Sequence, residues 1–320
     1  MIYFRGLKLL NSSMGSIMRF SKNIVLGLAT LGALAACEGA VKPYLRDDVA
    51  DRLAHPVWMV EREIPAGPFA LTAYERMHER HAPATIYIEG DGELTTDFRM
   101  DSKNPTPRNP VSLHLATKDK SENVAWIARP CQYYGIANCG EAYWGNERFS
   151  PEVLSSYNHA LDEIKKRWDI DGFHLVGFDG GGAVATILAA QRGDVLSLRT
   201  VAGTLNTNLY ASENKIAPLA GSLNPIDFAP ELADVPQTHY IGGQDKVISP
   251  ALLHSYLQAV GDSNCVQYRF IQEAEHDQGW VEKWPEFLAD KPRCEGPVEP
   301  VEFVPEPEPF VIQPETPDKK

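Results

Sequence analysis

The stretch Phe173-His-Leu-Val-Gly-Phe-Asp-Gly-Gly-Gly-Ala183 joins a short apolar run to a group of glycines. The run 173–176 predicts a buried strand, and the small residues from Ala183 to Gln191 predict a helix that packs tightly on it. The pattern Gly-x-Asp-x-Gly between them, centred on Asp179, is typical of a sharp turn that lifts its central side chain above a sheet. A dinucleotide-binding loop is the alternative, but it needs the spacing G-x-G-x-x-G and an early position in the chain.

Strands and helices are predicted to alternate around this turn. Ser150 and Pro151 are typical of a helix start, and apolar residues follow at helical spacing as far as Trp168. Such alternation predicts an α/β fold, with a mostly parallel central sheet and helices on both faces. The other predicted strands are 85–88, 124–128, 198–202, 238–241 and 266–271, and the other predicted helices are 250–260 and 280–288.

Two ionisable residues follow later predicted strands in an informative order. Asp245 lies in the loop after 238–241, and His276 lies just beyond 266–271. Nucleophile, acid and histidine occur in this order along the chain of one large hydrolase fold. The sequence Glu89-Gly-Asp-Gly92 follows the first clear strand, where backbone N–H groups are expected to face the same site.

The chain therefore resembles the α/β-hydrolase superfamily from about Trp58 to Leu288. More narrowly, it is similar to exported bacterial hydrolases of unassigned substrate. The resemblance implies that Asp245 is the triad acid, that His276 is the base, and that the N–H groups of Asp91 and Gly180 form an oxyanion hole. The narrower resemblance rests on Ile88-Glu-Gly-Asp-Gly92, Pro105-Thr-Pro-Arg-Asn-Pro110, Ala128-Arg-Pro-Cys-Gln-Tyr133, Ser222-Leu-Asn-Pro225 and His276 ahead of Gly279-Trp280.

Asp179 departs from the serine that the superfamily pattern places at this position. In one interpretation its carboxylate is the nucleophile, as in dehalogenases and epoxide hydrolases of the superfamily, and His276 activates water. However, Gly180 stands where a dehalogenase has a halide-binding tryptophan, and the oxyanion-loop histidine and cis-proline of epoxide hydrolases are missing. In a second interpretation Asp179 and His276 act as an acid/base or ion pair. In a third the site is inactive.

Two functions follow from these interpretations. The first is a membrane-anchored hydrolase that uses Asp179, Asp245 and His276 on a small ester-like or otherwise hydrolysable substrate. The alternative is an inactive α/β-hydrolase-fold protein that serves as a binding module in the cell envelope. Residues 205–234 are the expected cap segment over the site. No cofactor is expected, and no Cys/His spacing indicates a metal site.

The N-terminal residues 1–36 are expected to be a lipoprotein signal peptide. Arg19 and Lys22 precede the apolar run 24–34, which is too short to span a bilayer. Leu34-Ala-Ala-Cys37 resembles the lipobox of bacterial lipoproteins, which implies lipidation of Cys37. Glu38 in place of an inner-membrane aspartate signal favours the outer membrane. We therefore expect a Gram-negative, periplasm-facing lipoprotein; a plain signal peptide is the alternative.

The four remaining cysteines fit an exported protein. Cys131 and Cys139 lie close together in the chain, and Cys265 and Cys294 bracket the last predicted strand and helix. Disulfides 131–139 and 265–294 are the economical pairing, and they require an oxidising compartment. Four reduced, buried cysteines are the alternative.

The composition divides the rest of the chain. Residues 37–55 are expected to be a spacer, 56–294 the hydrolase domain, and 295–320 a disordered tail that holds seven prolines and seven acidic residues. The net charge of −13 and the lack of a Lys/Arg cluster argue against a nucleic-acid partner. The expected partners are a small-molecule substrate and, through Cys37, a membrane.

Overall fold

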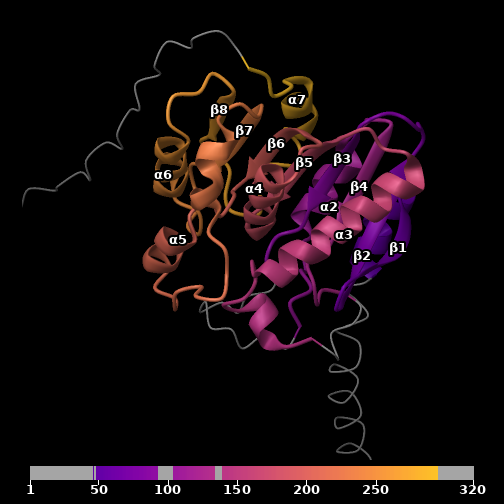
Figure 1. Cartoon of the computed structure of the whole chain (residues 1–320), viewed down its shortest axis with the longest axis horizontal. Coiled ribbons are helices and arrows are strands. Elements are labelled where there is room, and N and C mark those ends of the chain that lie inside the picture. Colours follow the sequence, from indigo (N-terminus) through magenta and orange to yellow (C-terminus); the bar gives the residue numbers. More distant parts are fainter. Residues whose placement is uncertain (1–45, 47, 93–103, 134–138, 295–320) are drawn as a thin grey trace, which may run out of the picture.

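A computed structural model describes residue 46 and residues 48–92, 104–133 and 139–294 (Figure 1). Its strands are β1 (Val60–Ala66), β2 (Phe69–Met77), β3 (Ala84–Ile88), β4 (Asn123–Ile127), β5 (Phe173–Phe178), β6 (Val195–Val201), β7 (Gln237–Gly242) and β8 (Val266–Ile271). Its α-helices include α2 (Val111–Lys118), α3 (Pro151–Trp168), α4 (Gly180–Gln191), α5 (Thr207–Glu213), α6 (Pro250–Val260) and α7 (Trp284–Ala289). Short 3₁₀ helices lie at η1 (His55–Val57), η3 (Glu141–Trp144) and η4 (Pro225–Leu232).

The strands form one sheet in the order β1-β2-β4-β3-β5-β6-β7-β8. The six strands from β4 to β8 in this order pair in parallel, whereas β1 with β2 and β2 with β4 pair antiparallel. The predicted mostly parallel sheet is therefore confirmed. Parallel pairing brings the carboxyl ends of β3, β5, β7 and β8 to one edge, where the loops with the candidate site residues begin.

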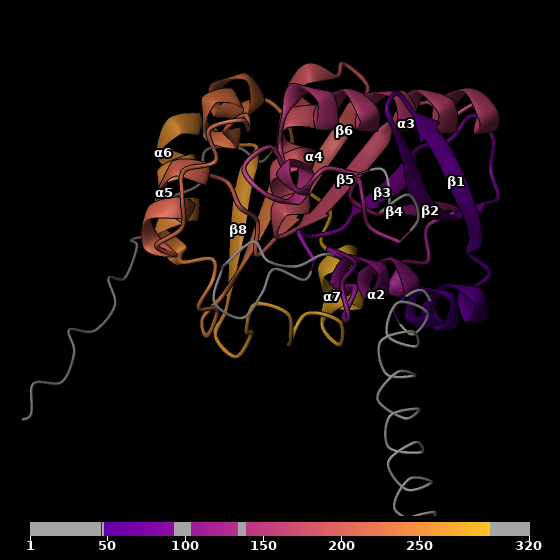
Figure 2. The ribbon, with the colours of Figure 1, turned by 90° about the horizontal axis from the view of Figure 1, so that it is seen from below.

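Helices cover both faces of the sheet (Figure 2). Helices α3 and α4 lie on one face, and α2 and α7 lie on the other. The start of α3 agrees with the sequence, because the Ser150 side chain accepts a hydrogen bond from the N–H of Val153 at 3.3 Å. Burial of side chains on both faces explains why β3, β4 and β5 are nearly continuous apolar runs rather than alternating ones.

The sheet begins earlier in the chain than the predicted strands did. The hairpin β1–β2 was not predicted, because Glu61, Arg62 and Glu63 interrupt the apolar pattern of an edge strand. Residues 48–54, expected within the spacer, are helical, and Ala50 and Ala54 are fully buried in the core. The folded part of the chain therefore extends into residues that a charged composition had suggested were a spacer. No described helix has the length and apolar character that crossing a membrane requires.

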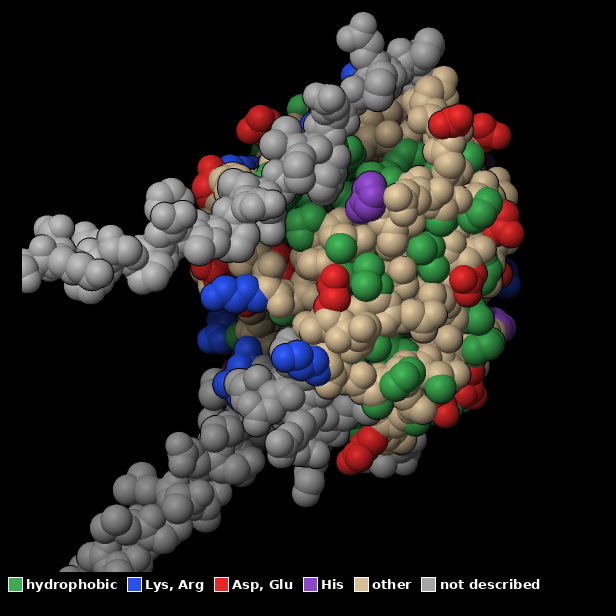
Figure 3. Space-filling view, turned by 90° about the vertical axis from the view of Figure 1, so that its left-hand side faces the viewer, with side chains coloured by type: hydrophobic (Ala, Val, Ile, Leu, Met, Phe, Trp, Pro, Cys, Tyr) green, Lys and Arg blue, Asp and Glu red, His purple; other side chains and the backbone are tan. Residues whose placement is uncertain are grey.

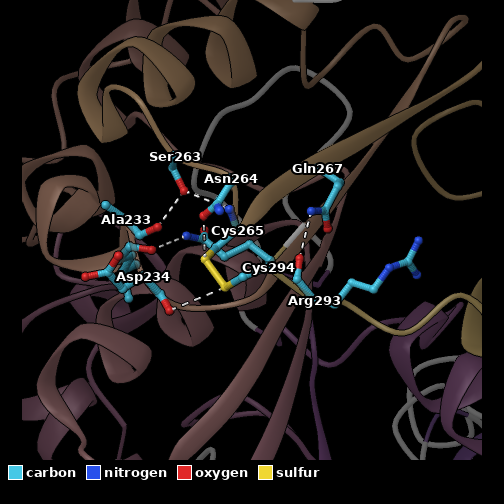
Figure 4. The surroundings of a disulfide bond; sticks show 10 residues. Ala233, Asp234, Ser263, Asn264, Cys265, Gln267, Arg293 and Cys294 are labelled. Carbon is cyan, nitrogen blue, oxygen red and sulfur yellow. Dashed lines mark hydrogen bonds between the residues drawn. A yellow bond between two sulfur atoms is a disulfide. The ribbon is translucent and has the colours of Figure 1, made fainter. Parts of the chain in front are cut away.

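Both predicted cysteine pairs are bonded. Cys131 and Cys139 lie with their sulfur atoms 2.06 Å apart, and Cys265 joins Cys294. Figure 4 shows the second bond beside hydrogen bonds from Ser263 to the carbonyl of Ala233 and from Gln267 to the carbonyl of Arg293. This disulfide ties the start of β8 to the chain after α7, so His276 lies inside the loop that it closes.

Candidate active site

Asp179 occupies the sharp turn between β5 and α4. Its backbone angles are φ 49° and ψ −121°, a left-handed conformation that is unusual for a residue with a side chain. Its N–H donates to the carbonyl of Val201 at 3.0 Å, and its own carbonyl accepts from the N–H groups of Gly182 and Thr204. These bonds to both neighbouring elements hold the residue in a conformation that costs on the order of 1–3 kcal/mol.

The glycines around Asp179 permit close packing of the turn. A Cβ at Gly181 would lie 2.3 Å from the carbonyl oxygen of Ile88, at the end of β3. The helix α4 begins at Gly180, three residues earlier than the predicted helix, directly behind Asp179. The Asp179 side chain thus stands at a helix N-terminus, where N–H groups favour negative charge.

Asp245 and His276 meet at the same edge of the sheet, as the sequence predicted. The Nδ1 atom of His276 lies 3.0 Å from Oδ2 of Asp245. The other Asp245 oxygen accepts hydrogen bonds from the N–H groups of Val247 and Ile248 at 2.8 and 2.9 Å, which fix the carboxylate. This bond directs Nε2 of His276 toward Asp179, and Nε2 lies 3.9 Å from Asp179 Oδ1. That contact is an ion-pair distance and is longer than a hydrogen bond.

The Asp179 carboxylate contacts the expected oxyanion-hole N–H group directly. The N–H of Asp91 donates to Asp179 Oδ2 at 3.0 Å, and the N–H of Gly180 also hydrogen-bonds this side chain. On the other oxygen, Thr204 Oγ1 donates to Oδ1 at 3.3 Å. The two carboxylate oxygens therefore have different environments: Oδ2 faces the N–H of Asp91, and Oδ1 faces Thr204 and His276.

The side chain of Asp91 is itself buried between two arginines. Arg129 Nη1 lies 2.8 Å from its Oδ1, and Arg148 Nη1 lies 2.6 Å from its Oδ2. The Arg129 and Arg148 side chains are 5% and 2% exposed, so water screens these pairs very little. Tyr210, on α5, hydrogen-bonds Arg148. This cluster fixes the loop whose N–H reaches Asp179.

Glu89 anchors the same loop from the other side. Its buried carboxylate accepts hydrogen bonds from Ser112 Oγ and Trp126 Nε1, both at 2.9 Å, and from the N–H of Gly90 at 3.0 Å. Burial raises the pKa of Glu89, although these donors oppose the rise. The side chain thus joins the loop after β3 to the start of α2.

Burial and neighbouring charges shift the pKa values of three ionisable groups in the site. Burial, together with repulsion from Asp91, raises the pKa of Asp179, although His276 opposes the rise. Burial disfavours the charged form of His276, but its bond to Asp245 and the charge of Asp179 outweigh this and raise the pKa of His276. Burial also disfavours ionisation of Asp91, but Arg148 and Arg129 hold its pKa below the usual range.

An open pocket of about 440 Å³ lies next to the histidine. It is lined by 243–247, after β7, and by 275–277, after β8, and so includes Asp245 and His276. Asp179 is not among its lining residues, and its side chain is 10% exposed. The predicted cap segment 205–234 contains α5 and η4, and it reaches the site through Tyr210.

Several residues of the site had no predicted role. Arg129 lies in a quoted motif, but nothing in the sequence distinguishes a buried arginine from an exposed one. Arg148, Thr204 and Tyr210 carry no motif, and only folding brings them to Asp91 and Asp179. Ser222 has a structural role instead, since its hydroxyl donates to the carbonyl of Asn146 at 2.7 Å and accepts from the N–H of Phe149 at 3.0 Å.

Solved structures share this architecture at low sequence identity. An esterase of Pyrococcus furiosus aligns with a TM-score of 0.53 and 12% identity, over 73% of this chain and 91% of its own. Est1E of Butyrivibrio proteoclasticus aligns with a TM-score of 0.50 and 13% identity, over 72% and 97%. An acylaminoacyl peptidase of Pyrococcus horikoshii aligns with a TM-score of 0.52 and 10% identity, over 75% of this chain and 43% of its own.

No family model and no curated protein matches the chain. The narrower resemblance to exported hydrolases therefore stays a prediction. The sheet order, the turn at Asp179 and these structural alignments together show that the chain has the α/β-hydrolase fold.

Proposed function

We propose that this protein is a hydrolase in which Asp179 is the nucleophile, His276 the base and Asp245 the residue that orients His276. The observation that carries the proposal is that the two carboxylate oxygens of Asp179 have different neighbours. Oδ2 accepts from the N–H of Asp91, and Oδ1 points to the side of His276. The backbone bond fixes Oδ2, and Oδ1, which accepts a longer bond of 3.3 Å from Thr204, is the oxygen oriented for attack.

The proposed substrate is a small molecule with a leaving group on an sp³ carbon. Asp179 Oδ1 attacks that carbon, the new C–O bond forms, and the leaving group departs with the bonding electron pair. His276 Nε2 then takes a proton from water, and the water oxygen attacks the Asp179 carboxyl carbon. The negative charge develops on Oδ2, where the N–H groups of Asp91 and Gly180 stabilise it. The bond between the Asp179 carboxyl carbon and Oδ1 then breaks, so the product leaves as an alcohol that carries Oδ1 and takes the proton from His276, and Asp179 keeps the oxygen of the water.

A single turnover in H₂¹⁸O tests this route. Attack of water on the enzyme ester places one ¹⁸O atom in Asp179, which mass spectrometry of the peptide detects. Direct attack of water on the substrate places the label in the product alone and contradicts the proposal. A panel of alkyl esters, epoxides and haloalkanes supplies the substrate. His276→Ala is expected to accumulate the alkylated Asp179, and Asp179→Asn to abolish turnover.

A binding module without catalysis is the second candidate, and one observation favours it. The pocket beside His276 does not include Asp179, which is nearly buried. In this case Asp179 Oδ2 occupies the place of an oxyanion, and the site is an inactive relative of a serine hydrolase. Ester turnover that is absent in the wild type and appears in Asp179→Ser supports this candidate. Turnover in the wild type that Asp179→Asn removes argues against it.

We also propose that Cys37 is lipidated and that the protein faces the periplasm from the outer membrane. The support is the sequence before Cys37 and the two disulfides, which suit an oxidising compartment. Residues 1–45 lie outside the described residues. Incorporation of labelled palmitate, lost in Cys37→Ser, tests the anchor, and fractionation of the two membranes tests the location.

A further inference from the structure

The N-terminal segment is attached to the domain at the edge that carries the site. The guanidinium of Arg46 donates hydrogen bonds to the carbonyls of Asn104 and Thr106 at 3.0 and 2.8 Å. Both carbonyls belong to the loop that connects the carboxyl end of β3 to the start of α2. The first described residue is therefore held at the carboxyl edge of the parallel strands.

Hydrogen bonds connect this loop to the site at two places. The side chain of Gln132 donates to the carbonyls of Gly90 and Pro105 at 3.0 and 3.3 Å, and Gly90 precedes Asp91. At the other end, Asn109 Nδ2 donates to the carbonyl of Asp277 at 3.3 Å, and Asp277 lines the pocket beside His276. The attachment of Arg46 thus lies on the rim of the proposed active site.

The attachment cannot swivel freely, because the following residues pack on the domain. Ala50 and Ala54 are fully buried, and Tyr74 donates a hydrogen bond to Asp51 at 2.8 Å. The helical residues 48–54, indigo in Figure 2, lie beside α2. The position of Arg46 relative to the sheet is therefore fixed by the fold.

The chain between Cys37 and Arg46 is short compared with the domain. Nine residues reach at most ~30 Å when fully extended. A compact domain of ~240 residues has a radius of gyration of ~18 Å and hence a diameter of ~45 Å. If the opposite edge of the domain rested on the bilayer, Arg46 would lie farther from the surface than this segment reaches.

We infer that, when Cys37 carries lipid, the carboxyl edge of the sheet faces the membrane and the active-site pocket opens toward the bilayer surface. The partner is a lipid surface, and the substrates that reach the pocket most readily are amphiphiles presented by it. The inference rests on the proposed lipidation of Cys37 and is independent of whether Asp179 is a nucleophile. On the face over α5 and α6 the visible apolar side chains lie in small groups, separated by backbone and by other side chains (Figure 3).

Fluorescence quenching on vesicles tests this orientation. A fluorescent amino acid replaces Glu275, exposed at the pocket, or Lys166, exposed near the end of α3 at the opposite edge. The lipidated full chain is reconstituted in phosphatidylethanolamine and phosphatidylglycerol vesicles that carry nitroxide headgroups. Position 275 is expected to be quenched more strongly than position 166. Equal quenching, or stronger quenching at 166, overturns the orientation.

Three variants test whether the short tether and its attachment at Arg46 set the orientation. A Gly/Ser insertion of about 20 residues after Ala40 adds ~25 Å of reach and is expected to remove most of the difference between the two positions. Arg46→Ala is expected to reduce it, whereas Arg52→Ala, at an exposed position of the same helix, leaves it unchanged. An unchanged difference in the extended chain contradicts the role of the short tether.

The outcomes separate this inference from the hydrolase proposal. A chain that takes up no palmitate overturns the orientation through its premise but leaves hydrolysis of soluble substrates untouched. Asp179→Asn is expected to lose turnover and to keep the quenching difference. Loss of the difference in Asp179→Asn contradicts the claim that the tether and its attachment, and not the active site, set the orientation.

Discussion

The Asp91 carboxylate offers a sharp test of what holds the site together. It is 3% exposed and contacts Arg129 and Arg148 at 2.8 and 2.6 Å. In Asp91→Asn the side chain keeps its shape but loses its charge, so two buried guanidinium groups lose the carboxylate that they share. Breaking a buried pair by removing one partner costs about 3–5 kcal/mol. For a domain of this size, each kcal/mol lowers the Tm by about 2–4 °C, so the expected fall is on the order of 6–20 °C.

The matched control is Asp169→Asn. Asp169 pairs with Arg80 at the surface, where the two side chains are 44% and 59% exposed, and asparagine also tolerates its left-handed backbone. An exposed pair contributes at most about 1 kcal/mol, so the control is expected to shift the Tm by no more than about 4 °C. Differential scanning calorimetry with the disulfides intact measures both variants. If Asp91→Asn falls no further than the control, Asp91 does not carry the proposed charge balance.

The pH dependence of stability gives a second check on the contacts of Asp91 with Arg129 and Arg148. The arginines lower the pKa of Asp91 in the folded state, so its contribution is complete above the unfolded value of about 3.9. It is lost as the pH falls through the lower folded pKa. Because Asp91 also raises the pKa of Asp179, the stability difference between wild type and Asp91→Asn is expected to widen as the falling pH protonates Asp179, and to shrink only in acid stronger than about pH 5. A difference that already shrinks near neutral pH contradicts this assignment.

Three further predictions concern other parts of the site and fold. A Cβ at Gly180 would lie 2.0 Å from Asp91 Oδ1, so Gly180→Ala is expected to lower the free energy of unfolding in urea by about 1–3 kcal/mol. A Cβ at Gly193 would have nothing within 4 Å, so Gly193→Ala is the control and changes stability little. Equal effects of the two substitutions contradict the packing argument. Because Asp245 and Asp179 raise the pKa of His276, the acidic limb of a kcat/KM profile is expected to lie above pH 6.5 and to move down in Asp245→Asn; an unmoved limb assigns it to another group. The Cys265–Cys294 bond spans 29 residues, and its loss is expected to lower the free energy of unfolding by ~3.5 kcal/mol. The Cys131–Cys139 bond spans 8 residues, and its loss is expected to cost ~2.5 kcal/mol. The opposite order in paired Cys→Ala variants contradicts the loop-closure estimate.

Local patterns in the sequence determined the central part of the fold. The strand before Gly177 and the small residues after Gly182 predicted the turn at Asp179, because glycines on both sides of a residue between a strand and a helix are typical of such a turn. Asp245 and His276 followed from their positions after later strands. Each of these predictions depends on residues that are neighbours in the chain, where periodicity and turn chemistry act directly.

The edges of the fold were harder to predict, because local patterns in the sequence are weak there. The hairpin β1–β2 has charged residues on its exposed edge, and the helical residues 48–54 are anchored by small alanines rather than by a long apolar stripe. Their stability comes from contacts with distant segments, such as the bond from Tyr74 to Asp51. These partners are distant in the chain, so the local sequence pattern alone did not predict the hairpin or the helical residues 48–54.

The sequence by itself determined that an aspartate stands at the nucleophile position, with an acid and a histidine following in order. Only the tertiary structure decided what surrounds that aspartate: Asp91 N–H on one oxygen, Thr204 and His276 on the other, and two buried arginines behind the loop. The reason is physical. Hydrogen-bond partners and buried charges depend on distances across the fold, and residues 129, 148 and 204 reach this site only when the sheet brings their loops to one edge.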